Sequence, residues 1–181
     1  ICIISDFFYS INSEGDNNTI LNNTLSNSLH FSINLYGGNN NLISSNTLSY
    51  NKFGISLSHN NNTNILLNNI SYSEAYGVLL YYAFGSDIEK NIISYTGYNE
   101  GYTYRAGISL AYVNELNNII NNTLINNHVY NVWLRGRSPD ELPKNNNVYD
   151  NIICVTGILD ENGGQNNKSN NVMDYYYNGT N

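Results

Sequence analysis

The amino-acid sequence predicts an all-β fold, a single-stranded parallel β-helix (solenoid) of about six or seven coils with 22 to 24 residues per coil. Three observations predict it. One short pattern recurs at nearly constant spacing, each copy contains short strands of alternating character, and no stretch has the 3.6-residue period of a helix. The 39 asparagines and 14 glycines supply residues that tolerate the left-handed backbone of sharp corners.

The first motif is the eight-residue stretch from Asn41 to Leu48, and it recurs in one frame along the chain. Further copies begin at Asn18, Asn64, Ser86, Asn117 and Asn146. The third position of the motif is aliphatic, and we expect these side chains to stack into a core: Ile20, Ile43, Leu66, Ile88, Ile119 and Val148. The sixth position is asparagine, and we expect a structural ladder of side-chain amides: Asn23, Asn46, Asn69, Asn91, Asn122 and Asn151.

A second motif follows in most copies and predicts another strand in each coil. Its clearest examples are residues 54–57, 77–80 and 107–110, each a glycine followed by apolar residues in alternation. Looser copies occupy residues 31–35, 132–134 and 157–159. Each coil is therefore expected to hold two or three short strands with asparagine or glycine at the corners.

Together, the pattern Asn-x-Ile-x-x-Asn-x-Leu and the following Gly-Ile-x-Leu resemble the repeats of right-handed parallel β-helix proteins. Within that group they look most like the repeats of archaeal and bacterial surface-layer or adhesin-like proteins. The resemblance covers about residues 12–178 and implies a right-handed coil. The same repeat occurs in a periplasmic copper-binding family and in carbohydrate-binding and sugar-hydrolysis domains, so the resemblance specifies fold more than function.

We expect a single β-helix domain over residues 1–181, part of a longer or processed chain because Ile1 is not a start methionine. Two insertions, at about 95–105 and 135–146, depart from the repeat. The longest apolar run, residues 78–84, is too short for a transmembrane helix.

The sequence contains few residues in arrangements that suggest catalysis, metal binding or nucleic-acid binding. A formal net charge of −7 argues against a nucleic-acid partner. No position of the repeat carries carboxylates on consecutive coils, which removes the simplest general acid/base site. His30, His59 and His128 fall at different places in their coils, so they do not line up as metal ligands. We therefore predict no catalytic residue, metal or cofactor, and leave open whether the protein is an enzyme.

The insertions hold the residues that we expect to contact a glycan or a protein partner: Tyr98, Tyr102, Tyr104, Arg105, Arg135 and Arg137. Exposed tyrosines stack on sugar rings or pack against proteins, although such loops can also simply cover the flank of the coil. Seven Asn-x-Ser/Thr sequons are candidate N-glycosylation sites, a number that the composition alone accounts for: Asn17, Asn22, Asn61, Asn69, Asn121, Asn167 and Asn178.

From these features we predict a non-catalytic structural module, extracellular or at the cell surface, in a surface layer, sheath, filament or adhesin. Its partners would be further copies of itself, as a homo-oligomer or polymer, and other surface proteins or glycans. The alternative function is a carbohydrate-binding or polysaccharide-cleaving β-helix of the lyase, hydrolase or viral-tailspike type.

Overall fold

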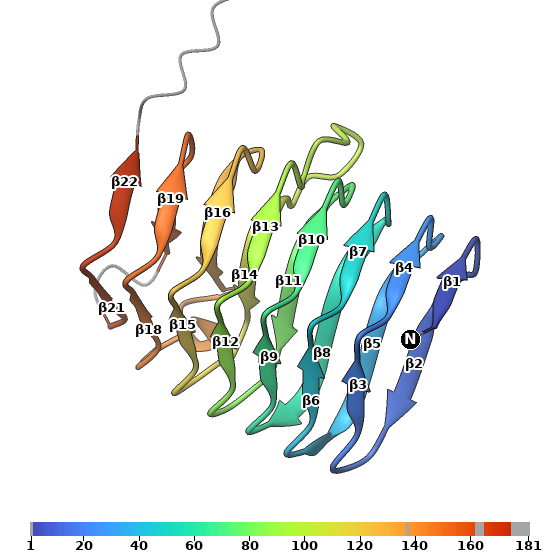
Figure 1. The fold of residues 1–181 in the computed structure, drawn as a ribbon. Helices are drawn as coiled ribbons and strands as arrows, with labels where there is room; N and C mark the ends of the chain where they lie inside the picture. Colours follow the sequence, from blue (N-terminus) through green and yellow to red (C-terminus); the bar gives the residue numbers. More distant parts are fainter. Residues whose placement is uncertain (1, 137, 162–164, 175–181) are drawn as a thin grey trace, which may run out of the picture.

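The computed structural model describes residues 2–136, 138–161 and 165–174. Its paired strands are all parallel and form three sheets that wrap around one core as a right-handed β-helix (Figure 1). The predicted fold class is confirmed.

Sheet A contains β1 (Ile3–Ser5), β4 (Thr24–Ser26), β7 (Thr47–Ser49), β10 (Asn69–Ser71), β13 (Ile92–Ser94), β16 (Thr123–Ile125), β19 (Ile152–Cys154) and β22 (Val172–Asp174). Sheet B contains β2 (Ile11–Glu14), β5 (Phe31–Asn39), β8 (Phe53–Asn61), β11 (Tyr76–Tyr81), β14 (Ala106–Ala111), β17 (Tyr130–Arg135) and β20 (Ile158–Asp160). Sheet C contains β3 (Thr19–Leu21), β6 (Leu42–Ser44), β9 (Asn64–Leu66), β12 (Asp87–Glu89), β15 (Asn118–Ile120), β18 (Asn147–Tyr149) and β21 (Asn167–Ser169).

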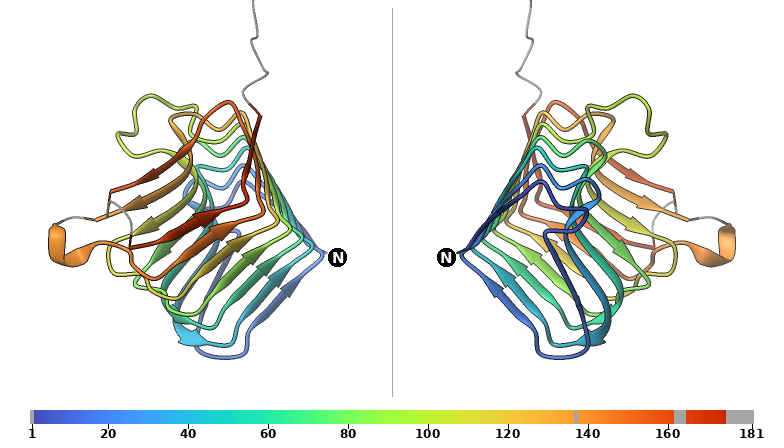
Figure 2. Two further views of the ribbon diagram at one scale, coloured as in Figure 1. Left: turned by 90° about the vertical axis from the view of Figure 1, so that its left-hand side faces the viewer. Right: turned by 90° about the vertical axis from the view of Figure 1, so that its right-hand side faces the viewer.

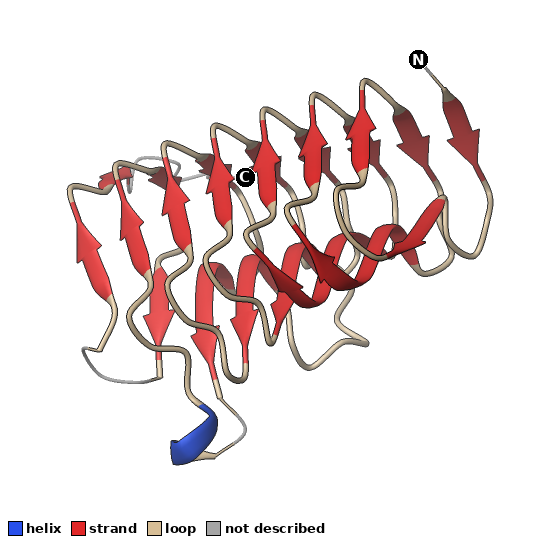
Figure 3. Ribbon diagram, turned by 90° about the horizontal axis from the view of Figure 1, so that it is seen from below, coloured by secondary structure: helices blue, strands red, loops and turns tan. Residues whose placement is uncertain are grey.

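Helical structure in the described ranges is limited to one 3₁₀ turn, η1 (Pro139–Glu141), visible as the blue element of Figure 3. None of the helical structure in those ranges is long and apolar enough to cross a membrane.

The core is built from stacks of inward-pointing aliphatic side chains, one residue per short strand. In sheet C, Ile43, Ile65 and Ile88 pair in register, and each is completely buried. The prediction that Leu66 occupies this stack was wrong, because Leu66 is half-buried and points outward beside Ile65. A shift of one residue moves every side chain of a strand to the other face, so the frame of this copy begins one residue earlier than the sequence pattern suggested.

The same one-residue shift changes which asparagine of this coil belongs to the ladder. Asn46 Nδ2 donates to Oδ1 of Asn68 (3.0 Å), and Asn68 Nδ2 donates to Oδ1 of Asn91 (3.0 Å), whereas Asn69 is exposed. The ladder at the corner between sheets C and A therefore contains Asn68 in place of Asn69. Its members are Asn23, Asn46, Asn68, Asn91, Asn122, Asn151 and Asn171.

Spacing along this ladder locates the two insertions. Consecutive members are 23, 22 and 23 residues apart up to Asn91, and then 31, 29 and 20 apart. The first insertion joins β13 to β14 and the second joins β17 to β18, so they leave the coil at the two ends of sheet B. Figure 2 shows both projecting from the same side of the solenoid.

Candidate functional site

The outer face of sheet B carries an aromatic cluster. Where β5, β8, β11 and β17 begin, the outward position is Phe31, Phe53, Tyr76 and Tyr130. The rings of Phe31 and Phe53 lie 4.9 Å apart and those of Phe53 and Tyr76 lie 6.2 Å apart. Parallel pairing in register places equivalent residues of successive coils next to each other, so the aromatic rings follow the helix axis.

The first insertion folds over this face and leaves a cleft of about 370 Å³. Tyr102 packs against Phe53 with 5.6 Å between ring centroids, and Tyr104 packs against Trp133 at the same separation of 5.6 Å. The walls and floor of the cleft are formed by His30, Phe31, Phe53, Tyr76, Leu79, Tyr81, residues 101–104 and Arg135. Its volume lies at the lower end of the range for small-molecule sites.

Arg135 is the one charged residue of the described ranges that is almost completely buried, with 5% of its surface exposed. Its guanidinium carbon lies 4.4 Å from the ring centroid of Tyr104 and 5.3 Å from that of Trp133. Its Nη2 donates to the Tyr76 hydroxyl at 3.4 Å, whereas its Nε has no hydrogen-bond partner among the described residues. Stacking against aromatic rings stabilises a cation but does not neutralise its charge.

No ion pair of the described residues includes Arg135. Burial raises the pKa of Tyr76 well above its ordinary value, and the nearby guanidinium only partly offsets that rise. Burial likewise raises the pKa of Tyr81. Both phenols therefore stay protonated at neutral pH and supply no negative charge to the guanidinium. A buried charge without a counter-ion is unfavourable, so the cleft is electrostatically suited to an anion.

His30 lies at the opposite end of the cleft, immediately before β5. Its ring stacks on Phe8 at 5.1 Å, and its Nδ1 is buried without a hydrogen-bond partner. Burial lowers the pKa of His30 from its ordinary 6.5, and the charge of Lys52 lowers it further. The imidazole is therefore neutral at neutral pH and is able to accept a proton.

The distance between these two ends limits what the cleft can do chemically. The guanidinium of Arg135 contacts Tyr76 of β11, and His30 precedes β5, two strands away in the sheet. Two strand spacings alone amount to about 10 Å, and the backbone of Arg135 lies a further two strands away in β17. A general base must lie within hydrogen-bonding reach of the proton that it removes, so one small ligand group does not contact both residues.

The structure brings together only part of the predicted contact set. Tyr102, Tyr104 and Arg135 line the cleft, but Tyr98 lies in a separate hollow, and Nη1 of Arg105 donates to the Gly97 carbonyl at 3.2 Å. Arg135 was predicted to begin the second insertion. It is instead the last residue of β17, and its side chain lies on the outer face of sheet B with Tyr76. Arg137 lies outside the described residues.

Sequence reasoning missed His30, Phe53, Tyr76 and Tyr81 as site residues. A signal for them exists, because in four copies an aromatic residue stands two positions before the first buried aliphatic residue of the second motif: Phe31, Phe53, Tyr76 and Tyr130. His30 and the first insertion are far apart in the sequence, and only the stacking of coils places both along one cleft.

Among the sequons, Asn17, Asn22, Asn69, Asn121 and Asn167 are exposed. Asn61 is half-buried, and its Nδ2 donates to Oδ1 of Asn39 at 2.9 Å. Asn178 lies outside the described residues, and glycan occupancy of the others stays a prediction. The part of the chain that the structure describes contains no cluster of three or more His, Cys, Asp or Glu side chains suited to a metal ion.

Comparison with known proteins decides the family. The model of the right-handed β-helix region matches residues 2–153. This chain belongs to the right-handed β-helix family. Curated proteins give no sequence match.

Solved structures with the same fold include an alginate lyase from Paenibacillus sp. str. FPU-7, at a TM-score of 0.73 and 17% identity over 94% of this chain and 68% of the lyase. The periplasmic alginate epimerase AlgG gives 0.72 and 12%, covering 93% of this chain and 44% of AlgG. The A-module of a mannuronan C-5 epimerase from Azotobacter vinelandii gives 0.64 and 15%, covering 91% of this chain and 55% of the module.

At these identities the likeness shows the fold alone. The chain spans about two thirds of the lyase and less than half of AlgG. The predicted similarity to surface-layer and adhesin-like proteins gains no support from these matches.

Proposed function

We propose that this chain is a polysaccharide-binding β-helix whose cleft on sheet B holds an acidic sugar. One observation carries the proposal. Arg135 is a buried cation without a carboxylate partner among the described residues, and it lines an aromatic cleft. A ligand carboxylate entering the cleft would supply the counter-ion that the protein lacks.

The chemistry of an acidic glycan matches this cleft in two ways. Its carboxylate can accept hydrogen bonds from a guanidinium in the paired geometry that arginine favours. The apolar C–H faces of its rings can pack against Tyr102 and Tyr104, which the first insertion presents from above. The structural neighbours named for alginate and mannuronan, polymers of uronic acids, support this ligand class.

A second candidate function is cleavage or epimerisation of the same polymer, and His30 is the observation that favours it. A neutral imidazole in the cleft could accept the acidic proton next to a sugar carboxylate. His30 and the guanidinium are separated by at least two strand spacings, which places them on different sugars. Binding is therefore the primary proposal and catalysis the second.

We further propose that the protein acts outside the cytoplasm, where polysaccharides of this class are encountered. Self-association into a layer or filament stays a prediction.

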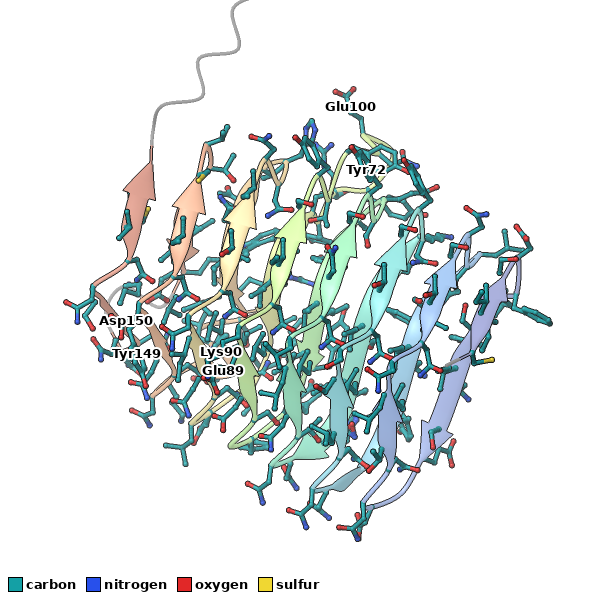
Figure 4. The ribbon with its side chains drawn as sticks, in the orientation of Figure 1. Tyr72, Glu89, Lys90, Glu100, Tyr149 and Asp150 are labelled. Atoms are coloured by element: carbon teal, nitrogen blue, oxygen red, sulfur yellow. The ribbon has the colours of Figure 1, made fainter. Side chains whose placement is uncertain are left out.

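The test is affinity electrophoresis through gels that contain alginate, polygalacturonate or neutral dextran. Wild-type protein should be retarded by the acidic polymers and not by dextran. The variant Arg135→Met should bind about tenfold or more weakly, because a charged hydrogen-bonded contact is lost. The matched control is Lys90→Met, which removes an exposed cation beside Glu89. Lys90 follows β12 and lies on the face formed by sheets A and C (Figure 4).

Two results would contradict the proposal: equal retardation by all three polymers, or retardation of Arg135→Met that equals that of wild type. Incubation with alginate, followed by the absorbance of unsaturated product, tests lyase cleavage, and proton exchange into the polymer tests epimerisation. His30→Gln should abolish either activity if the second candidate is right.

A further inference from the structure

The corner between sheets A and B carries a stack of tyrosines that the cleft does not use. Tyr50 and Tyr72 lie 4.9 Å apart at an interplanar angle of 5°, and Tyr72 and Tyr95 lie 5.1 Å apart at 6°. All three rings are substantially exposed, by 58%, 37% and 41%. Tyr72 marks this edge in Figure 4.

Backbone geometry does not account for these tyrosines. Each adopts a left-handed conformation, with φ of 54°, 53° and 53°. Left-handed backbone favours asparagine and disfavours bulky side chains. The equivalent corners of the flanking coils have asparagine, Asn27 with φ of 54° and Asn126 with φ of 52°. Three consecutive coils therefore place an exposed aromatic ring where asparagine is the favourable residue for the turn.

The first insertion turns this stack into one wall of a hollow. Tyr98 and His128 face Tyr50, Tyr72 and Tyr95 across a space of about 380 Å³. Burial raises the pKa of Tyr98, and the nearby Glu74 and Tyr50 raise it further. The phenol is therefore a neutral hydrogen-bond donor at neutral pH, in a different hollow from Tyr104.

A third hollow, of about 370 Å³, shares one lining residue with the tyrosine hollow and one with the cleft. Its lining is polar and includes Lys52, Glu74 and Asn27. Tyr50 lines both this hollow and the tyrosine hollow, and Tyr102 lines both this hollow and the cleft. Lys52 Nζ lies 5.6 Å from the ring centroid of Tyr102, so a charged group stands at the junction.

We propose that the cleft, the polar hollow and the tyrosine hollow form one continuous groove that holds a single polysaccharide chain along several consecutive sugars. This inference rests on the proposed function and adds a second aromatic subsite, formed by Tyr50 and Tyr98, to the Arg135 cleft. Sugar rings contact the tyrosines at each end, and Lys52 and Glu74 bind hydroxyl or carboxylate groups between them. The ligand is therefore a polymer bound at internal residues rather than a mono- or disaccharide.

The test is isothermal titration calorimetry with alginate oligosaccharides of increasing length, starting from the dimer. In wild type, affinity should rise with length until the groove is filled. In Tyr98→Ala and Tyr50→Asn, the dimer should bind as in wild type while long oligomers lose about tenfold in affinity, because ring stacking at one end is removed. Tyr50→Asn installs the residue that the neighbouring corners carry, so the turn is preserved.

The control is Tyr149→Ala, a tyrosine of β18 in sheet C away from the groove (Figure 4), which should follow the wild-type length dependence. Affinity that does not change beyond the dimer, or variants of both groove tyrosines that match wild type at every length, would overturn the extended groove and leave the cleft intact. Failure of every oligosaccharide to bind would overturn the proposed function itself.

Discussion

The asparagine ladder and the aromatic cleft are built from the same coil spacing but differ in how their polar groups are satisfied. Within the ladder, Nδ2 of Asn91 donates to Oδ1 of Asn122, to the Ile65 carbonyl and to the Glu89 carbonyl, and its Oδ1 accepts from Asn68. In the cleft, Nη2 of Arg135 donates to the Tyr76 hydroxyl at 3.4 Å, and its Nε has no partner among the described residues.

In this repetitive fold, the way in which a buried polar group is paired distinguishes residues that stabilise the fold from residues that are available to a ligand. A fully satisfied polar ladder fixes register and stabilises the folded chain. A buried cation that its own protein leaves unpaired contributes little to stability and is available to a ligand.

The largest effect is expected from Asn68→Ala. This substitution leaves the buried amide N–H of Asn46 and the Ile43 carbonyl without their partners, so it should lower the free energy of unfolding by about 3 kcal/mol. Urea denaturation measures it. The adjacent Asn69→Ala is the matched control and should change stability by less than about 0.5 kcal/mol. Equal effects at the two positions would contradict the corrected register.

Replacing Arg135 should change the free energy of unfolding in the opposite direction. Arg135→Met replaces a buried unpaired charge with an apolar side chain, so we expect a gain of about 1 kcal/mol in unfolding free energy alongside the loss of glycan binding. Urea denaturation of the same protein used in the binding assay gives the value. A destabilisation as large as that of Asn68→Ala would mean that Arg135 is a structural residue.

A smaller loss is expected at the tyrosine stack. Tyr72→Ala removes the central ring of the stack, and aromatic pairs of this geometry contribute about 0.5 to 1.5 kcal/mol beyond their buried area. Tyr72 has a left-handed backbone, and alanine disfavours that conformation as well. The substitution therefore recovers little stability through reduced backbone strain. Thermal unfolding followed by circular dichroism should show a small decrease in Tm. An increase would show that the stack is strained.

The smallest effect concerns pH. The pKa of His30 is lowered in the folded state, so below pH 6.5 the unfolded chain binds more protons than the folded one. The contribution of His30 to stability is therefore complete above pH 6.5 and is lost as the pH falls from 6.5 through the lowered pKa. Urea denaturation across this range should show a shallower decline for His30→Phe than for wild type. Parallel declines would contradict the proposed burial of His30.

The sequence was sufficient to predict the solenoid, because aliphatic residues such as Ile43 and Ile88 recur where stacking requires them. It was insufficient for the coil of Asn68, where two adjacent asparagines and two adjacent apolar residues, Ile65 and Leu66, fit either of two frames. Three of the six predicted contact residues, Tyr102, Tyr104 and Arg135, line the cleft. His30 and Tyr76 were missed because contacts between coils depend on which face each residue occupies, which local motifs do not specify.

The central claim is most directly tested by a crystal structure of this chain with an alginate oligosaccharide. We predict a sugar carboxylate within hydrogen-bonding distance of the Arg135 guanidinium, with the neighbouring rings against Tyr102 and Tyr104. An oligosaccharide bound on sheet A or sheet C, with the cleft empty and the guanidinium unpaired, would contradict the claim.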